Sequence, residues 1–234
     1  MTESVLYIAT LLAVLLSLFA QIYVSSTFKR YSRTATLRGA SAESVARYVL
    51  DEAGCQDVRI ERVRGSLTDH YDPRTKTLRL SDSVYGNASA AAVGVACHEA
   101  GHAIQHRANY FPVKVRSALV PVTTFASRTW SWLLIAGVGA MLLLPTDGTL
   151  GYILLLVALG TLALTTLFQL VTLPCEFDAS RRALRAMRQS GYFETRELGS
   201  ARKVLSAAAL TYIASALVSV LQLLRILSIL RRRR

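Results

Sequence analysis

Long stretches without charge are the feature that most limits what this chain can fold into. Four stretches contain no Asp, Glu, Lys or Arg: residues 5–28, 129–146, 148–175 and 204–224. A membrane-spanning helix needs about 20 mostly apolar residues, so each stretch predicts a helix in or across a membrane. Because 52% of the chain is hydrophobic, only a small part remains for a domain in water.

The positive charges predict orientation in the membrane rather than binding to nucleic acid. The net charge is +12, and Lys and Arg cluster beside apolar stretches, at residues 29–38 and 181–188. Such residues tend to stay in the cytoplasm, whereas the turn at 145–148 has none. We therefore expect a multi-pass protein of the bacterial plasma membrane, with the N-terminus and this turn outside and residues 29–128 on the cytoplasmic side.

The apolar stretch near each end of the chain allows more than one arrangement in the membrane. The first stretch lacks a basic segment before it and is followed by Lys29, which favours a retained anchor over a cleaved signal peptide. At the other end, residues 231–234 are all arginine and would lie outside if residues 204–224 crossed fully. That segment either crosses, re-enters the membrane or lies at the interface, where Arg225 could extend to water.

The segment between the first two apolar stretches predicts a small α+β domain. Residues 41–54 place apolar side chains at helical spacing between Ser41 and Gly54, the pattern of an amphipathic helix. Short alternating runs then predict a small antiparallel sheet, with strands near 58–60, 67 and 78–80 and turns at 64–65 and 72–74. Asn87 or Ser89 can cap a helix over residues 90–107, and an amphipathic stretch at 113–126 leads back to the membrane.

His98, Glu99 and His102 form the motif HExxH on this last predicted helix. Residues four apart share one helical face, so both imidazoles can bind one tetrahedral zinc. Glu99 is then placed beside a water molecule on the metal and can act as the general base for peptide hydrolysis. The motif is short, and the helical context is what gives it meaning.

A catalytic zinc site needs a third protein ligand. His106 continues the spacing, but three residues spread along a straight helix cover about 12 Å and cannot meet at one metal. Glu176, in the segment PCEFDASRRAL after the third apolar stretch, is the better candidate, with Asp178 as its competitor. The alternative is that both acids merely favour the start of a helix, because Pro174 is expected to end the preceding one.

Three segments carry a resemblance to a known family: DHYDP (69–73), TLRLSDSVYGNASAAAVGVACHEAGHAIQH (77–106) and PCEFDASRRAL (174–184). With these segments the chain resembles the YugP-like membrane zinc metallopeptidases of bacteria. The resemblance implies a neutral zinc peptidase of the plasma membrane, and it carries over onto His98, His102 and Glu176 as ligands and Glu99 as base. Because His98 and His102 supply two nitrogens on one helical face and Glu176 can complete the set, we expect one Zn²⁺ per chain. Ser180 stands where thermolysin-like enzymes have an Asp that orients a ligand histidine, so Asp178 or Asp82 are candidates for that role.

The expected fold is mostly α-helical and membrane-integral, with three to four hydrophobic helices and a small zincin-like α+β insert. The expected parts are an anchor (1–28), the insert (29–128), a membrane hairpin (129–175), a second catalytic helix (176–203) and a hydrophobic segment with a basic tail (204–234). The expected partners are membrane lipid and peptide or protein substrates that lie close to the membrane, without nucleic acid.

Other interpretations remain for the motif and for its neighbours. A site-2-type intramembrane protease also has HExxH on an apolar helix, but residues 88–97 are a short run, and the Asp147-Gly148 pair is expected on the opposite side of the membrane. A scaffold with a structural metal would not need Glu99. In DHYDP, His70 and Tyr71 either stabilise an oxyanion or belong to an ordinary turn. The three cysteines have no metal-binding or disulfide spacing.

Overall fold

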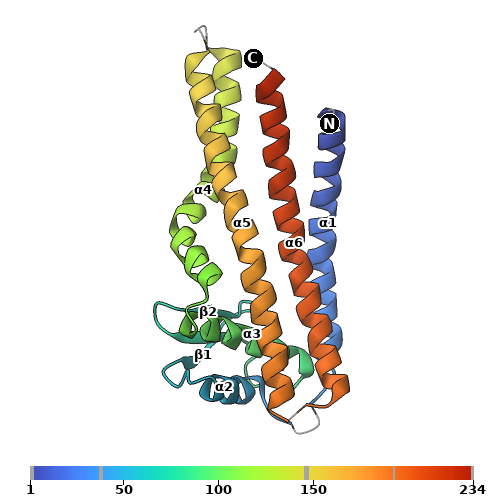
Figure 1. The fold of residues 1–234 in the computed structure, drawn as a ribbon. Coiled ribbons are helices and arrows are strands. Elements are labelled where there is room, and N and C mark those ends of the chain that lie inside the picture. Colours follow the sequence, from blue (N-terminus) through green and yellow to red (C-terminus); the bar gives the residue numbers. More distant parts are fainter. Residues whose placement is uncertain (1–2, 37–38, 145–147, 192, 233–234) are drawn as a thin grey trace. The chain divides into compact units, whose positions relative to one another are not determined.

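A computed structural model describes residues 3–36, 39–144, 148–191 and 193–232. Its elements, in chain order, are α1 (Glu3–Tyr31), α2 (Ala42–Glu52), β1 (Arg59–Val63), β2 (His70–Asp72), β3 (Thr77–Ser81), α3 (Ala90–Arg107), α4 (Phe111–Leu143), α5 (Thr149–Gln189) and α6 (Thr195–Arg232) (Figure 1). The chain divides into two compact units, residues 1–18, 115–173 and 212–234 in the first, and residues 19–114 and 174–211 in the second. The expected fold class, mostly helical with a small sheet, is confirmed.

Four helices of the described residues, α1, α4, α5 and α6, are long and apolar enough to cross a membrane. Helix α6 is unbroken from Thr195 to Arg232, so no break of the kind that a re-entrant segment needs occurs in it. Residues 145–147 of the expected turn at 145–148, and the last two arginines, lie outside the described residues.

The first unit packs apolar helices through small and hydroxyl side chains. A Cβ added at Gly151 of α5 would lie 2.8 Å from the carbonyl oxygen of Gly137 in α4, so these two backbones touch. Thr166 of α5 donates to the carbonyl of Ser219 in α6 at 3.3 Å. Close approach of this kind is how helices pack in lipid, where apolar burial gives little drive. Many other apolar side chains of the unit are exposed, Ile135 and Leu142 among them, which is what a lipid-facing surface requires.

The sheet of the second unit has the order β1-β3-β2. Strand β2 pairs antiparallel with β3, as expected, whereas β1 pairs parallel with β3. The purely antiparallel sheet was therefore a wrong prediction. The chain leaves β1, passes to the far side of β3, forms β2 and returns as β3, so the last strand lies between the other two. Thr77, Leu78, Leu80 and Ser81 of β3 are accordingly fully buried.

The second strand was placed wrongly at Leu67, and it lies at residues 70–72 instead. Gly65 and Leu67 have positive φ angles of 112° and 56°, which a strand does not contain. His70 and Tyr71, expected in a turn, therefore belong to β2. The turn that follows is as predicted: the Asp72 carboxylate accepts hydrogen bonds from the backbone N–H of Arg74 and from the Thr75 hydroxyl, both at 2.9 Å.

One hydrophobic core joins α2, the sheet and α3. The apolar face of α2, including Val49 and Leu50, packs with Leu78 and Leu80 of β3 and Val93 of α3. The same cluster takes in side chains from α5 and α6, at Ala183, Met187, Ala201, Val204 and Leu205. Burying a Leu or Val side chain stabilises a fold by about 1.5–3 kcal/mol, so this core holds α3 in place.

Pro174 does not end a helix, contrary to expectation. Helix α5 continues through it from Thr149 to Gln189, because proline removes one backbone hydrogen bond and kinks a helix without always breaking it. Glu176 and Asp178 therefore lie inside a helix. The interpretation that they favour a helix start does not hold, since no helix starts there.

Candidate metal centre

Helix α3 presents His98 and His102 on one face. The helix begins at Ala90, and Ser89, one of the two predicted caps, accepts the backbone N–H of Ala92 through its hydroxyl at 3.2 Å. Both histidines are buried, with exposed fractions of 9% and 8%. Their ring centroids are 4.9 Å apart and their planes are nearly perpendicular, at 83°, so the two Nε2 atoms can point at one common position.

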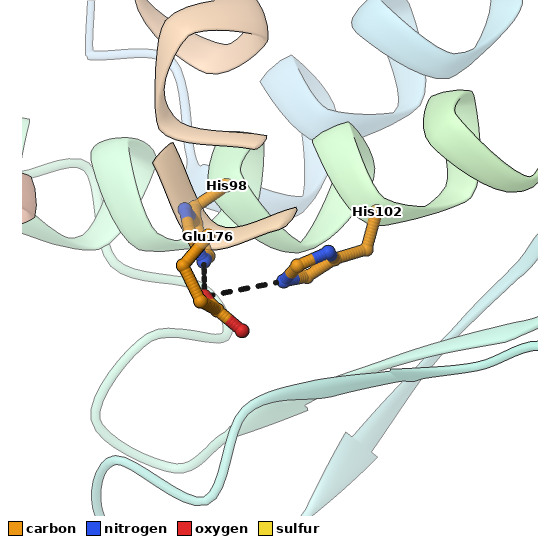
Figure 2. A group of neighbouring side chains, drawn as sticks. All are labelled: His98, His102 and Glu176. Carbon is orange, nitrogen blue, oxygen red and sulfur yellow. Dashed lines mark hydrogen bonds and ion pairs between the residues drawn. The ribbon is translucent and has the colours of Figure 1, made fainter. Parts of the chain in front are cut away.

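Glu176 of α5 lies against both rings (Figure 2). Its Oε2 atom is 3.1 Å from Nε2 of His98 and 3.5 Å from Nε2 of His102, and its side chain is buried. Among the described residues, these three form a group whose ligand atoms all lie within 4.8 Å of one another. Asp178, the competing carboxylate, is not in the group.

A close backbone contact sets α5 against α3 at this point. A Cβ on Gly101 would lie 2.7 Å from the carbonyl oxygen of Ala179, a separation that carbon atoms do not adopt without movement. Gly101 stands between the two histidines in the sequence, and Ala179 follows Glu176 by less than one helical turn. The absence of a side chain at residue 101 is what allows the carboxylate to reach the histidines.

The donor set fits a zinc ion. Two nitrogens and a carboxylate oxygen form the three-ligand set of a catalytic zinc site. Ligands held about 2.0–2.1 Å from a tetrahedral centre are about 3.3 Å apart, and the separations of 3.1 and 3.5 Å agree with that value. A cation at this position would also compensate the charge of a carboxylate that is buried with two histidines.

Glu99 is partly buried on α3 next to His98. Its Oε2 atom accepts the backbone N–H of Tyr71 at 3.1 Å, which connects strand β2 to the motif. Burial raises the pKa of Glu99, and the neighbouring His102 and His98 oppose that effect. A carboxylate whose pKa is raised is a stronger proton acceptor when it is ionised.

The outer nitrogen of each histidine has a partner that the sequence did not predict. Nδ1 of His98 lies 3.1 Å from the hydroxyl of Ser180, and Nδ1 of His102 lies 3.0 Å from Oε1 of Gln105. Both partners stand at helical spacing from a metal-ligand candidate, Ser180 four residues after Glu176 and Gln105 three after His102. Helical spacing from a candidate ligand is therefore the sequence signal that could have identified both residues.

The two acids considered for that role lie elsewhere. Asp178 accepts a hydrogen bond from Gln105 at 2.8 Å and pairs with Arg182 at 2.6 Å, so it reaches His102 only through Gln105. Asp82 accepts hydrogen bonds from Arg62 and from the backbone N–H of Gly65. Neither acid binds a ligand histidine directly.

The remaining sequence candidates separate into those near the site and those away from it. Tyr71 is half-buried, its ring centroid lies 5.7 Å from that of His106, and burial raises its pKa to about 12. His70 is exposed, with Nδ1 at 2.9 Å from the carbonyl of Thr68. Burial also raises the pKa of Cys97 to about 12, so this thiol stays protonated and is a poor nucleophile.

Comparisons with known proteins identify the family of the chain. A family model described as "Putative neutral zinc metallopeptidase" matches residues 6–231. The chain is 44% identical over 220 residues to the "Putative membrane protease YugP" of Bacillus subtilis (strain 168), with 94% of each chain covered. No solved structure matches the chain. Because this match includes most of α1, all of α3 with its HExxH motif, and all of α5 with Glu176, the chain belongs to the neutral zinc metallopeptidase family of that description.

Proposed function

We propose that this protein is a membrane-bound zinc metalloendopeptidase that binds one zinc ion through His98, His102 and Glu176. The observation that carries the proposal is the convergence of both Nε2 atoms on one carboxylate oxygen, at 3.1 and 3.5 Å. Zinc at this position would lower the pKa of a water molecule and polarise the carbonyl of a peptide bond.

Glu99 is the proposed general base. The backbone N–H of Tyr71 holds its Oε2 atom and so orients the carboxylate, leaving Oε1 to take a proton from the attacking water. The same oxygen then returns the proton to the amine that leaves. Glu99 is not in the group of candidate metal ligands, so its substitution should affect the proton transfers without removing a ligand.

The substrate is proposed to be an extended peptide segment close to the membrane. Strand β2 is an edge of the sheet, and Tyr71 connects it to Glu99. An extended peptide that adds to a sheet edge gains backbone hydrogen bonds, and at this edge it would lie alongside the catalytic side chains. The same helix, α5, carries both a candidate membrane span and Glu176, which favours substrates that are themselves near the bilayer.

The site is proposed to face the cytoplasm. The basic residues at 29–33 and 181–188 flank the segments that carry the histidines and Glu176, and such residues remain on the cytoplasmic side. With four crossings both ends of the chain lie outside, so the C-terminal arginines are an exception to the same rule.

Three matched variants test the proposal. Glu176→Ala should lose zinc affinity and peptidase activity, whereas Glu99→Gln should lose activity and keep zinc, because only the first change removes a ligand. Asp178→Ala should affect zinc less than Glu176→Ala. The measurements are zinc content of the purified full-length protein and peptides released in membranes of wild type and Glu99→Gln, compared by mass spectrometry.

The results also separate the proposal from its alternatives. Full zinc content in a His98→Ala, His102→Ala double variant would rule this site out. Equal zinc affinity and no proteolysis in both wild type and Glu99→Gln would favour a membrane scaffold. If Asp178→Ala lost zinc and Glu176→Ala kept it, the third ligand would be Asp178.

A further inference from the structure

We propose that Gln105 is a positioning residue that holds His102 in one tautomer, with the proton on Nδ1, and thereby presents Nε2 as a lone pair before the metal binds. The inference deepens the proposed function and rests on zinc binding at His98, His102 and Glu176. It concerns a side chain that does not touch the metal position itself.

Gln105 is a fully buried polar side chain with its hydrogen bonds satisfied. Its Nε2 atom donates to the carbonyl oxygen of Cys175 and to Oδ2 of Asp178, both at 2.8 Å. Its Oε1 atom lies 3.0 Å from Nδ1 of His102. An amide offers two N–H donors and a carbonyl acceptor, and all of these face partners here.

These partners allow only one orientation of the amide. A backbone carbonyl cannot donate, so the Cys175 oxygen requires an N–H in front of it. Turning the amide over would bring Oε1 to the place 2.8 Å from two acceptor oxygens, and a buried polar group without a hydrogen bond costs about 1–3 kcal/mol. Arg182 holds Asp178 in place at 2.6 Å, which keeps the second acceptor where it is.

The orientation of Gln105 decides the tautomer of His102. Because Oε1 can only accept, Nδ1 of His102 must carry a proton, and the neutral ring then has its lone pair on Nε2. That lone pair faces Oε2 of Glu176 at 3.5 Å, an arrangement of two electron-rich atoms that a cation between them would stabilise. His98 differs, since its Nδ1 faces the Ser180 hydroxyl, and a hydroxyl can either donate or accept.

Gln105 also connects the two helices that supply the ligands. Its acceptors, Cys175 and Asp178, stand on either side of Glu176 in α5, while Gln105 and His102 belong to α3. One buried amide therefore fixes both the ring of His102 and the position of the segment that carries the third ligand. Residues that orient metal ligands in this way typically change metal affinity by about 10- to 100-fold when replaced.

The test reads the tautomer in metal-free protein. Full-length protein labelled with ¹⁵N-histidine, in detergent micelles with a chelator at pH 8, gives long-range ¹H–¹⁵N spectra that distinguish a protonated ring nitrogen from a bare one. The chain has four histidines, so His70→Gln, His98→Gln and His106→Gln variants assign three sets of signals and leave the fourth to His102. We expect Nδ1 of His102 to be protonated and Nε2 to be bare.

Three variants give the matched comparison. Gln105→Met keeps the shape and removes the hydrogen bonds, so His102 should become a mixture of tautomers, and zinc affinity should fall by about 10- to 100-fold. Gln105→Glu keeps an acceptor oxygen for Nδ1 of His102 but sets its second oxygen against the acceptors of Cys175 and Asp178, so the proton should stay on Nδ1 while the free energy of unfolding falls. Ser180→Ala, which removes the partner of His98, should leave the His102 spectrum unchanged.

A proton on Nε2 of His102 in the metal-free wild type would overturn the inference, as would an unchanged His102 spectrum in Gln105→Met. The wild-type spectrum, once assigned, does not depend on any change at Gln105, so it decides even if Gln105→Met folds poorly. The spectrum is also independent of metal and of hydrolysis. The inference about the His102 tautomer can therefore be refuted while zinc binding and peptidase activity are observed. It can also be confirmed while the proposed function is refuted.

Discussion

Replacing Gly101 with Ala tests how strictly the site depends on the contact between α3 and α5. The new Cβ would lie 2.7 Å from the carbonyl oxygen of Ala179 and 3.2 Å from its Cα. Both are backbone atoms, so no side-chain rotation can relieve the overlap. The two helices must move apart.

The size of that movement follows from the distances. Ordinary contact begins at 3.4 Å and the Cβ would lie at 2.7 Å, so the difference, 3.4 minus 2.7, is 0.7 Å. Zinc–ligand distances tolerate about ±0.2 Å, and Glu176 moves with Ala179 because both lie on α5. We expect zinc affinity to fall at least about tenfold, comparable to the loss of a residue that orients a ligand. The free energy of unfolding should also fall by about 1–3 kcal/mol through overpacking.

Two other helical glycines supply a graded control. At Gly94 the added Cβ would lie 3.1 Å from the Ala201 methyl carbon, and at Gly199 nothing lies within 4 Å. Gly199→Ala should raise the free energy of unfolding by up to about 1 kcal/mol and leave zinc binding unchanged. The effects of Gly94→Ala should lie between those of Gly101→Ala and Gly199→Ala. Zinc affinity is measured by competition with a fluorescent chelator, and stability by denaturant unfolding in micelles. Wild-type zinc affinity in a folded Gly101→Ala protein would refute the argument that this contact places Glu176.

Stability, acid sensitivity and membrane orientation provide further tests. Leu78→Ala empties a fully buried position in β3 and should lower the free energy of unfolding by about 2–5 kcal/mol; a loss under about 1 kcal/mol would contradict its place in the core. The hydrogen bonds from the Arg74 N–H and the Thr75 hydroxyl lower the pKa of Asp72, so its stabilisation is present at neutral pH and is lost as the pH falls below 3.8, the ordinary value. The melting temperature of wild type should consequently fall more steeply in acid than that of Asp72→Asn, and parallel curves would argue against it. A cysteine at the exposed Arg74 should react with a membrane-impermeant reagent only after cells are opened, and labelling of intact cells would reverse the proposed orientation.

The helices and the convergence of the three site residues were within reach of the sequence. Apolar length predicted the candidate spans, and the four-residue spacing of His98 and His102 predicted their common face. Glu176 was selected because a third ligand was required and a carboxylate followed the third apolar stretch. The spans and the shared face of the histidines thus follow from hydrophobic length and helical spacing, and Glu176 follows from the ligand number that zinc requires.

What the sequence did not predict depends on contacts between distant segments. The alternation of apolar and polar residues predicts a strand at Leu67, but this pattern carries no information about the backbone, which has a positive φ there. The Leu67 N–H instead donates to the Ser83 hydroxyl at 3.4 Å, a contact with a distant segment. The parallel pairing of β1 with β3 depends on the path of the chain around β3, which no local pattern encodes. Gln105 and Ser180 stand at helical spacing from a candidate ligand, but the hydrogen bonds of Ser180 to His98 and of Gln105 to Cys175 and Asp178 depend on how α3 and α5 pack.

The order of the ligands along the chain has a consequence for biosynthesis. Glu176 follows His98 by 78 positions, and at about 5–20 residues per second the ribosome adds the third ligand roughly 4 to 16 s after the first. During that interval α4 and the apolar part of α5 are synthesised, and the nascent chain carries HExxH with an incomplete ligand set. The candidate metal site therefore cannot be completed until both of these candidate membrane spans have been synthesised, so zinc binding by all three residues must follow their synthesis.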